Sequence, residues 1–206
     1  MTDDEPVPRV VPLLSLVAAM GRAFLLTGRP GVGKTTVIQA VVDRLGTAAG
    51  GFYTQEIRER GQRTGFRLVA LDGASGILAS VNISGPCRVG KYGVDLHDLE
   101  QVGVRALRRA AERPEVTTVV IDEIGKMELC SQAFCEAVLA VLDSPKTVLA
   151  TVMGRATVVA GPHPWVDAIK ARPRVTLVEV TLANRQALPE RILHWLQQAP
   201  EGSTSA

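Results

Sequence analysis

The sequence predicts an α/β fold, a three-layer sandwich whose mostly parallel sheet carries an antiparallel strand addition. Two observations predict the layers: apolar, β-branched runs alternate with segments of helical periodicity, and a glycine-rich turn joins the first run to the first helix. A third observation predicts the addition, since three strand-like runs between residues 52 and 82 are separated only by short turns.

The first strand and helix flank the glycine-rich turn. Residues 23–26 are an apolar run, and residues 34–45 carry apolar side chains at helical spacing. The turn between them, Gly28-Arg29-Pro30-Gly31-Val32-Gly33-Lys34-Thr35, has the pattern G-x-x-x-x-G-K-[ST] in the strand–turn–helix setting that a P-loop requires. The sequence therefore predicts a loop that binds phosphate groups.

The residue types of this turn indicate how a triphosphate is held. Glycines let backbone N–H groups curl around phosphate oxygens, and the amino end of the helix adds the positive end of its dipole. Lys34 would reach the β- and γ-phosphates, and Thr35 would ligate Mg²⁺, the expected cofactor. The expected nucleotide-binding residues are Gly28, Arg29, Pro30, Gly31, Val32, Gly33, Lys34, Thr35 and Thr36.

Strands at 52–58, 64–71 and 76–82 come next, because β-rich runs are separated by turns at Gly61 and at 72–75. A glycine-rich loop then leads to a helix at 96–112, with Asp95 as its N-cap and Asp98 three residues on.

That loop carries two candidate catalytic cations, Arg88 and Lys91. Positive charge supplied near the transferred phosphoryl group stabilises the transition state. The alternative, left open by the sequence, is that both side chains make ion pairs at the surface.

A P-loop needs a carboxylate for Mg²⁺ at the carboxyl end of a buried parallel strand. The run at 117–121 is the most β-branched in the chain and ends in Asp122-Glu123. We expect Asp122 to be the metal ligand and Glu123 the general base that polarises the attacking water. The alternative is a surface acidic pair at a strand end.

The remaining pattern continues the alternation, with helices at 131–142, 165–170 and 185–197 and strands at 147–152 and 175–180. In P-loop ATPases with an adjacent Asp-Glu pair, a strand at this point inserts between the P-loop strand and the Asp-bearing strand. By this resemblance we expect strand 147–152 to do so, with Thr151 facing the γ-phosphate. A buried core threonine is the alternative.

Two residues after the last strand, Asn184 and Arg185, are candidates to flank the base or ribose, with helix capping by Asn184 as the alternative. The segment 184–187 is the nearest match to a guanine-reading N-K-x-D, and it lacks the carboxylate. This excludes a guanine-specific switch and favours broad use of nucleotides.

The amino-acid composition limits the number of domains and the kinds of binding partner. The chain has 206 residues, 46% of them hydrophobic, and a net charge of +2, which suits one sizeable core and argues against a nucleic-acid surface. We expect one domain at 20–198, an extension at 1–19 and a polar tail at 199–206. No run reaches the ~18–20 apolar residues of a membrane span, and the flank of the apolar run at 10–19 is acidic, unlike a secretory signal.

The cysteines bear on the compartment. Cys87, Cys130 and Cys135 show no C-x-x-C pairing, which argues against a zinc site and a disulfide framework. We therefore expect an intracellular, cytoplasmic and reducing location.

Five segments, taken together, carry a resemblance. They are 28–36, 51–58 (G-F-Y-T-Q-E-I-R), 88–95 (R-V-G-K-Y-G-V-D), 122–129 (D-E-I-G-K-M-E-L) and 181–185 (T-L-A-N-R). In this order they resemble the small nucleoside-triphosphatase family described from thermophiles, whose animal member is called cancer-related nucleoside-triphosphatase. The resemblance covers about residues 21–197. It implies a RecA-like P-loop NTPase core and slow, Mg²⁺-dependent hydrolysis of several nucleoside triphosphates to diphosphate and phosphate.

Two other functions stay open. The family is similar to nucleotide kinases, and a kinase lid could use Arg155, Arg172 and Arg174 in the irregular segment 154–174. A nucleotide-gated binding module could use the basic run at 105–113, although such runs are mostly solvated faces. We expect nucleoside triphosphates as the partners, with no nucleic acid, no membrane and a monomeric chain.

Overall fold

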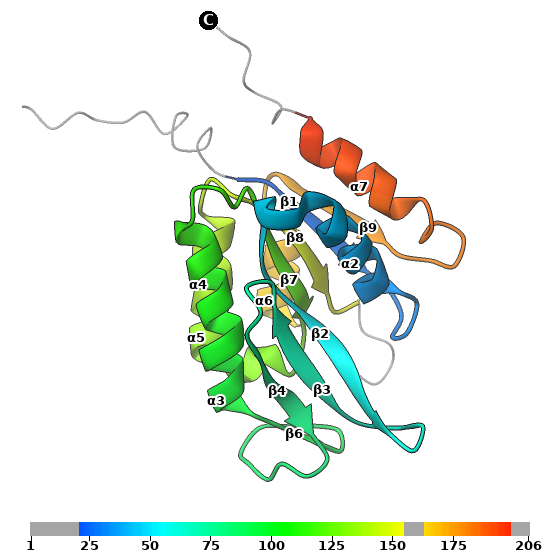
Figure 1. The fold of residues 1–206 in the computed structure, drawn as a ribbon, viewed down its shortest axis with the longest axis vertical. Coiled ribbons are helices and arrows are strands. Elements are labelled where there is room, and N and C mark those ends of the chain that lie inside the picture. The colour runs from blue at the N-terminus through cyan, green and yellow to red at the C-terminus, as the bar shows by residue number, and fades with distance from the viewer. Residues whose placement is uncertain (1–20, 155–162, 199–206) are drawn as a thin grey trace, which may run out of the picture.

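A computed structural model describes residues 21–154 and 163–198, and within them one mixed sheet has nine strands (Figure 1). The strand order is β5-β6-β4-β3-β2-β7-β8-β1-β9. The strands are β1 Ala23–Thr27, β2 Ala49–Glu59, β3 Gln62–Ala70, β4 Ser75–Ser80, β5 Arg88–Val89, β6 Tyr92–Val94, β7 Thr118–Ile124, β8 Thr147–Val152 and β9 Val175–Glu179. From β2 through β7, β8 and β1 to β9 the neighbours are parallel, and from β2 outward to β5 they are antiparallel.

Helices cover both faces of this sheet. They are α2 Lys34–Leu45, α3 Leu96–Asp98, a π-helical stretch Leu99–Val104 that leads into α4 Arg105–Glu112, α5 Gln132–Leu142, α6 Pro164–Lys170 and α7 Leu188–Gln197. Short 3₁₀ turns lie at Gly46–Ala48 and Glu128–Cys130. In Figure 1, α2 and α7 lie together on one side of the strands, while α4 and α5 lie side by side on the other.

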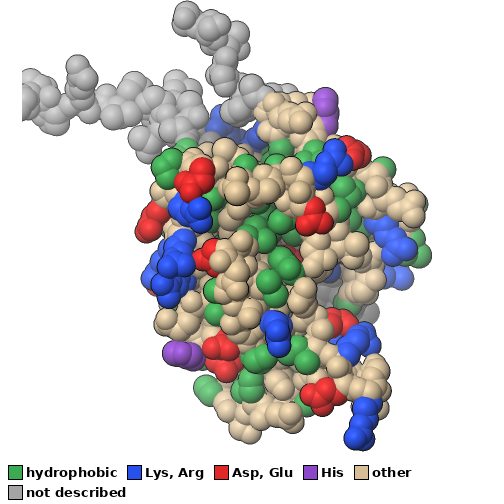
Figure 2. Space-filling view, viewed as in Figure 1, with side chains coloured by type: hydrophobic (Ala, Val, Ile, Leu, Met, Phe, Trp, Pro, Cys, Tyr) green, Lys and Arg blue, Asp and Glu red, His purple; other side chains and the backbone are tan. Residues whose placement is uncertain are grey.

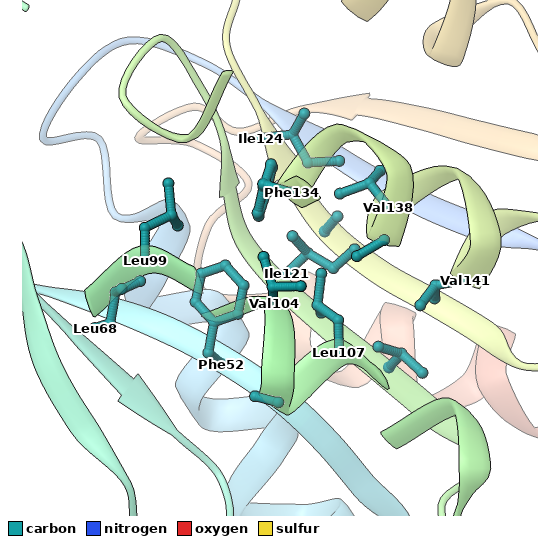
Figure 3. Close-up of a cluster of buried hydrophobic side chains, with 14 of the residues drawn as sticks. Phe52, Leu68, Leu99, Val104, Leu107, Ile121, Ile124, Phe134, Val138 and Val141 are labelled. Atoms are coloured by element: carbon teal, nitrogen blue, oxygen red, sulfur yellow. The ribbon is translucent and has the colours of Figure 1, made fainter. Parts of the chain in front are cut away.

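Two separate hydrophobic clusters hold the layers together, because helices pack on both faces of the sheet and each face buries its own apolar side chains. The larger one joins the sheet to α4, α5 and α6, and Figure 3 shows Phe52 and Ile121 of the sheet meeting Leu107 of α4 and Phe134 of α5. The smaller one joins Phe24 and other β1 residues to α2 and α7. The predicted α/β sandwich is therefore confirmed.

The sheet order also confirms the expected insertion of one strand. β8 lies between β1 and β7, so the strand that bears Thr151 separates the P-loop strand from the Asp122 strand. This order brings the carboxyl ends of all three strands to one edge of the sheet.

The structure differs from the sequence-based elements in two places. The segment 88–94, expected as loop, forms the β5–β6 hairpin, in which β6 pairs with β4. The last helix begins at Leu188 rather than at residue 185. Asn184 holds the preceding residues in a turn, because its side chain accepts the N–H of Thr181 and donates to the carbonyl of Glu179.

The charged surface is mixed in sign. On the face in Figure 2, blue and red side chains are interspersed over the described residues rather than gathered by sign, which accords with the net charge of +2. Within the described ranges, no helix combines the length and apolar character needed to cross a bilayer. The expected extension at 1–19, the tail at 199–206 and Arg155 lie outside the described residues.

Candidate active site

The P-loop joins the end of β1 to the start of α2. Gly28 has a φ of +148° and a Cβ there would lie 2.8 Å from the carbonyl oxygen of Val180, so only glycine fits. Gly33, the N-cap of α2, has a φ of +110°, and no side-chain hydrogen bond caps the helix. The first N–H groups of α2 therefore have no side-chain cap, and such uncapped helix N-termini are suited to binding anions.

Lys34 folds back over this loop toward the neighbouring acidic pair. Its Nζ donates to the carbonyl of Gly28 at 3.3 Å and lies 3.6 Å from Oε2 of Glu123. The Lys34 side chain is only 11% exposed, whereas that of Glu123 is 31% exposed. The lysine thus links the P-loop to Glu123, and the carboxylate keeps access to solvent.

Asp122 lies at the centre of a buried hydrogen-bonded cluster. Its Oδ2 accepts the hydroxyl of Thr35 at 2.7 Å, and its Oδ1 accepts the hydroxyl of Thr151 at 2.5 Å. Burial raises the pKa of Asp122, while the bonds from Thr151, Thr35 and the backbone N–H of Thr54 oppose that rise. The cluster exists because β1, β8 and β7 are neighbours in the sheet.

The donor set of this cluster fits a hard cation. A hydroxyl and a carboxylate oxygen are the ligands that Mg²⁺ takes from P-loop proteins, with waters and phosphate oxygens completing the shell. The described residues include no group of three or more His, Cys, Asp or Glu side chains that could hold a metal. An ion at Thr35 and Asp122 would therefore depend on the bound phosphates as well.

Glu123 follows Asp122 directly, and the peptide bond between them is cis. Burial raises the pKa of the Glu123 carboxyl, and the nearby Lys34 ammonium opposes this. A partly exposed carboxylate beside the P-loop lysine can polarise a water molecule that reaches it from solvent.

Arg88 and Lys91 lie on the β5–β6 hairpin, at the opposite edge of the sheet order from β1. The guanidinium of Arg88 donates to the carbonyls of Ile83 and Lys91, at 3.0 and 2.9 Å. The Nζ of Lys91 lies 5.4 Å from the ring centroid of Tyr92. The printed contacts of both side chains thus lie within their own loop and hairpin.

The expectation that the cysteines form no disulfide was wrong. The structure joins Cys87 and Cys130 by a disulfide and leaves Cys135 as a free thiol among the described cysteines. The pairing could not be predicted from sequence because the two cysteines are 43 residues apart. Only the fold brings the start of the hairpin beside the 3₁₀ turn after β7. The disulfide ties the segment before Arg88 to the segment that follows Asp122-Glu123.

Arg185 lies against the P-loop, whereas Asn184 is used by the local turn described above. The Nη1 of Arg185 donates to the carbonyl of Val32 at 3.2 Å, and its Cδ lies 3.6 Å from the place of a Cβ on Gly33. Arg185 is thus the one of the two whose side chain reaches the phosphate-binding loop.

Two of the arginines considered for a kinase lid, Arg172 and Arg174, do not support one. Arg172 pairs with Asp143, and both Arg172 and Arg174 precede β9. Because β9 runs parallel to β1, these residues lie at the amino ends of the strands, away from the P-loop. The expectation that they could reach the phosphates was wrong.

Sequence reasoning gave no role to one buried residue of this region, Glu128. It is 4% exposed, and burial, together with the charge of Glu123, raises its pKa to about 8. A glutamate that follows Asp122 by only six residues was the available signal, but burial cannot be read from that spacing.

Comparison with known proteins identifies the family of this chain. A family model described as NTPase matches residues 23–193. The chain is 48% identical over 174 residues to nucleoside-triphosphatase THEP1 of Thermotoga sp. (strain RQ2), a match that spans 84% of this chain and 95% of that protein.

Two solved structures are also similar. The crystal structure of THEP1 from Aquifex aeolicus has a TM-score of 0.75 and 37% identity, covering 85% of this chain and 99% of that one. The solution structure of a human cancer-related nucleoside triphosphatase has a TM-score of 0.73 and 41% identity, covering 86% and 98%. These matches confirm the resemblance carried by the five segments. The chain therefore belongs to the NTPase family that includes THEP1 and the cancer-related nucleoside-triphosphatases of animals.

Proposed function

We propose that this chain hydrolyses nucleoside 5'-triphosphates to diphosphate and phosphate. The observation that carries the proposal is the joining of two halves of one site, in which Lys34 of the P-loop lies 3.6 Å from Glu123 and Thr35 bonds Asp122. The names of the relatives support it, because those described above are called triphosphatases. The family match over residues 23–193 also supports a single catalytic domain at 20–198.

Each residue has a task in this proposal. The P-loop N–H groups and Lys34 bind the β- and γ-phosphates, and the lysine leaves its contact with Glu123 for the phosphate. The Glu123 carboxylate, then released from its cation, accepts the hydrogen bond of the attacking water and orients it toward the γ-phosphorus. Water is the proposed nucleophile, because the side chain of Glu123 is 31% exposed and water can reach it.

Mg²⁺ is proposed at Thr35 and Asp122, where it would neutralise charge on the β- and γ-phosphate oxygens. Thr151 orients the Asp122 carboxylate through its 2.5 Å hydrogen bond, and we propose that it senses the γ-phosphate. Omission of Mg²⁺ in the presence of a chelator is expected to stop phosphate release.

Base selectivity is proposed to be broad. The chain lacks a guanine-reading N-K-x-D motif, and Arg185 beside the P-loop offers a planar cation that can stack on any base or contact the ribose. Asn184 would support this contact by holding the turn before α7.

The test of the function is product analysis with ATP, GTP, CTP and UTP, with and without candidate acceptors such as nucleoside monophosphates. We expect diphosphate and phosphate in equal amounts from every triphosphate, at rates that acceptors do not change. Transfer of the phosphoryl group to an acceptor, well above release of phosphate, would identify a kinase instead. A preference for one base above ~100-fold would contradict broad selectivity, since that ratio requires specific polar readout.

Arg88 and Lys91 are proposed to supply further positive charge to the transition state. The support is the disulfide at Cys87, which anchors the start of their hairpin beside the turn that follows Glu123. Arg88→Ala is then expected to lower kcat on the order of 10³-fold with little change in KM. A wild-type kcat in steady-state phosphate-release assays would contradict the role, and the bonds of Arg88 within its own loop would then be its whole function. Arg58→Ala, an exposed arginine of β2, is the matched control.

A further inference from the structure

Glu128 is a buried carboxyl group that the proposed reaction does not use. It begins the 3₁₀ turn Glu128–Cys130 directly after β7, and its Oε2 accepts the backbone N–H of Gly125 at 3.2 Å. The N–H of Leu129 in turn donates to the carbonyl of Gly125 at 3.1 Å. Glu128 and the backbone after it thus bond both polar groups of the Gly125 residue.

The Glu128 carboxyl lies next to that of Glu123. A Cβ built on Gly125 would meet Oε2 of Glu128 at 3.0 Å and Oε1 of Glu123 at 3.3 Å. The two carboxyl groups therefore border the same small space beside Gly125. Among the ion pairs of the described residues none involves Glu128, although burial of a carboxyl group without a cation is costly.

Both features bear on where the Glu123 carboxylate lies. Gly125 is two residues from Glu123, so the hydrogen bond to its N–H holds the backbone that carries the proposed base. Of the two residues that border this space, Glu128 is 4% exposed, whereas the side chain of Glu123 is 31% exposed and contacts Lys34. Small displacements of a catalytic group have large effects on rate, on the order of 10²-fold for about 1 Å.

We propose that Glu128 is a positioning residue that fixes the Gly125 turn and thereby sets the position of the Glu123 carboxylate. This inference rests on the proposed hydrolysis and on the role of Glu123 in it. Glu128 touches neither substrate nor metal ligand in this proposal, and it acts only through Glu123.

The first test compares two substitutions. Glu128→Leu keeps much of the side-chain volume but leaves the Gly125 N–H without an acceptor, and we expect kcat to fall at least ~10-fold. Glu128→Gln keeps an oxygen that can accept the Gly125 N–H, and this variant is expected to retain most of the wild-type kcat. Binding of a non-hydrolysable triphosphate should have an unchanged Kd in both, because the P-loop is not altered. Equal loss in both variants, or a parallel rise in Kd, would overturn the proposal.

The second test is a double-mutant cycle with Glu123→Gln. If Glu128 acts through Glu123, Glu128→Leu lowers kcat in the wild type but has no further effect once Glu123 is glutamine. Ser131→Ala is the matched control, because Ser131 is also buried and caps α5 through the N–H of Phe134. Its loss should lower Tm and have the same small effect on kcat in both backgrounds. Equal fold-changes for Glu128→Leu in both backgrounds would overturn the proposal.

A third variant keeps the proposal testable if Glu128→Leu does not fold. Gly125→Ala puts a methyl group between the two carboxyl groups, within 3.0 Å of Glu128 and 3.3 Å of Glu123, and is expected to lower kcat without changing nucleotide Kd. An unchanged kcat in folded Gly125→Ala would overturn the positioning role. If the wild-type chain releases no phosphate, both the proposed function and this inference are overturned. If the wild type is active but Glu128→Leu lowers kcat equally with and without Glu123→Gln, only the inference is overturned.

Discussion

Lys34→Ala is expected to abolish detectable turnover, with kcat/KM lowered on the order of 10³-fold or more. The substitution removes the cation that reaches the β- and γ-phosphates, and no other lysine or arginine of the described residues forms an ion pair with Glu123. The remaining Glu123 carboxylate would then repel the γ-phosphate. Loss of rate should therefore come with weaker nucleotide binding.

Phosphate release measured over a range of ATP concentrations checks this result, with nucleotide Kd measured in parallel. Arg44→Ala is the control, because Arg44 is a cation of the same helix, α2, and pairs at the exposed surface with Glu190. We expect this control to keep wild-type kinetics. Turnover of Lys34→Ala within ~10-fold of the wild type would exclude the P-loop lysine from the reaction.

Glu123→Gln is expected to slow hydrolysis by about 10²- to 10⁴-fold while sparing nucleotide binding. The amide keeps the size of the side chain but accepts no proton and has no charge for the attacking water. The change also removes the 3.6 Å ion pair with Lys34, which frees the lysine for phosphate. Nucleotide affinity should thus be unchanged or higher, the opposite of the Lys34→Ala result.

Single-turnover phosphate release separates this effect from product release, and a Kd for ATP at low turnover checks the binding. Glu190→Gln, an exposed glutamate of α7, is the matched control for the loss of one carboxylate. Unchanged phosphate release in Glu123→Gln would exclude Glu123 as the base and would mean that other groups orient the attacking water.

The local parts of the site could be predicted from sequence because they depend on neighbouring residues. The spacing of Gly28, Gly33, Lys34 and Thr35 predicts a phosphate loop, and the β-branched run before Asp122 predicts a carboxylate at a strand end. The helix at 34–45 and the strand at 147–152 agree with the structure for the same reason, since their periodicity is local.

Features that depend on distant segments could not be predicted in this way. The pairing of Cys87 with Cys130 is one example, and the position of Arg172 at the edge opposite the P-loop is another. The β5–β6 hairpin escaped prediction because its short strands form only against β4. The burial of Glu128 beside Glu123 belongs here as well.

The sequence by itself determined the two halves of the site and the family, through motifs whose residues lie close together along the chain. Only the tertiary structure decided how closely the halves meet, since the hydroxyl of Thr35 lies 2.7 Å from Asp122 and the Nζ of Lys34 lies 3.6 Å from Glu123. Thr35 and Asp122 are 87 residues apart, and the distance between such segments depends on long-range packing that a local sequence pattern does not record.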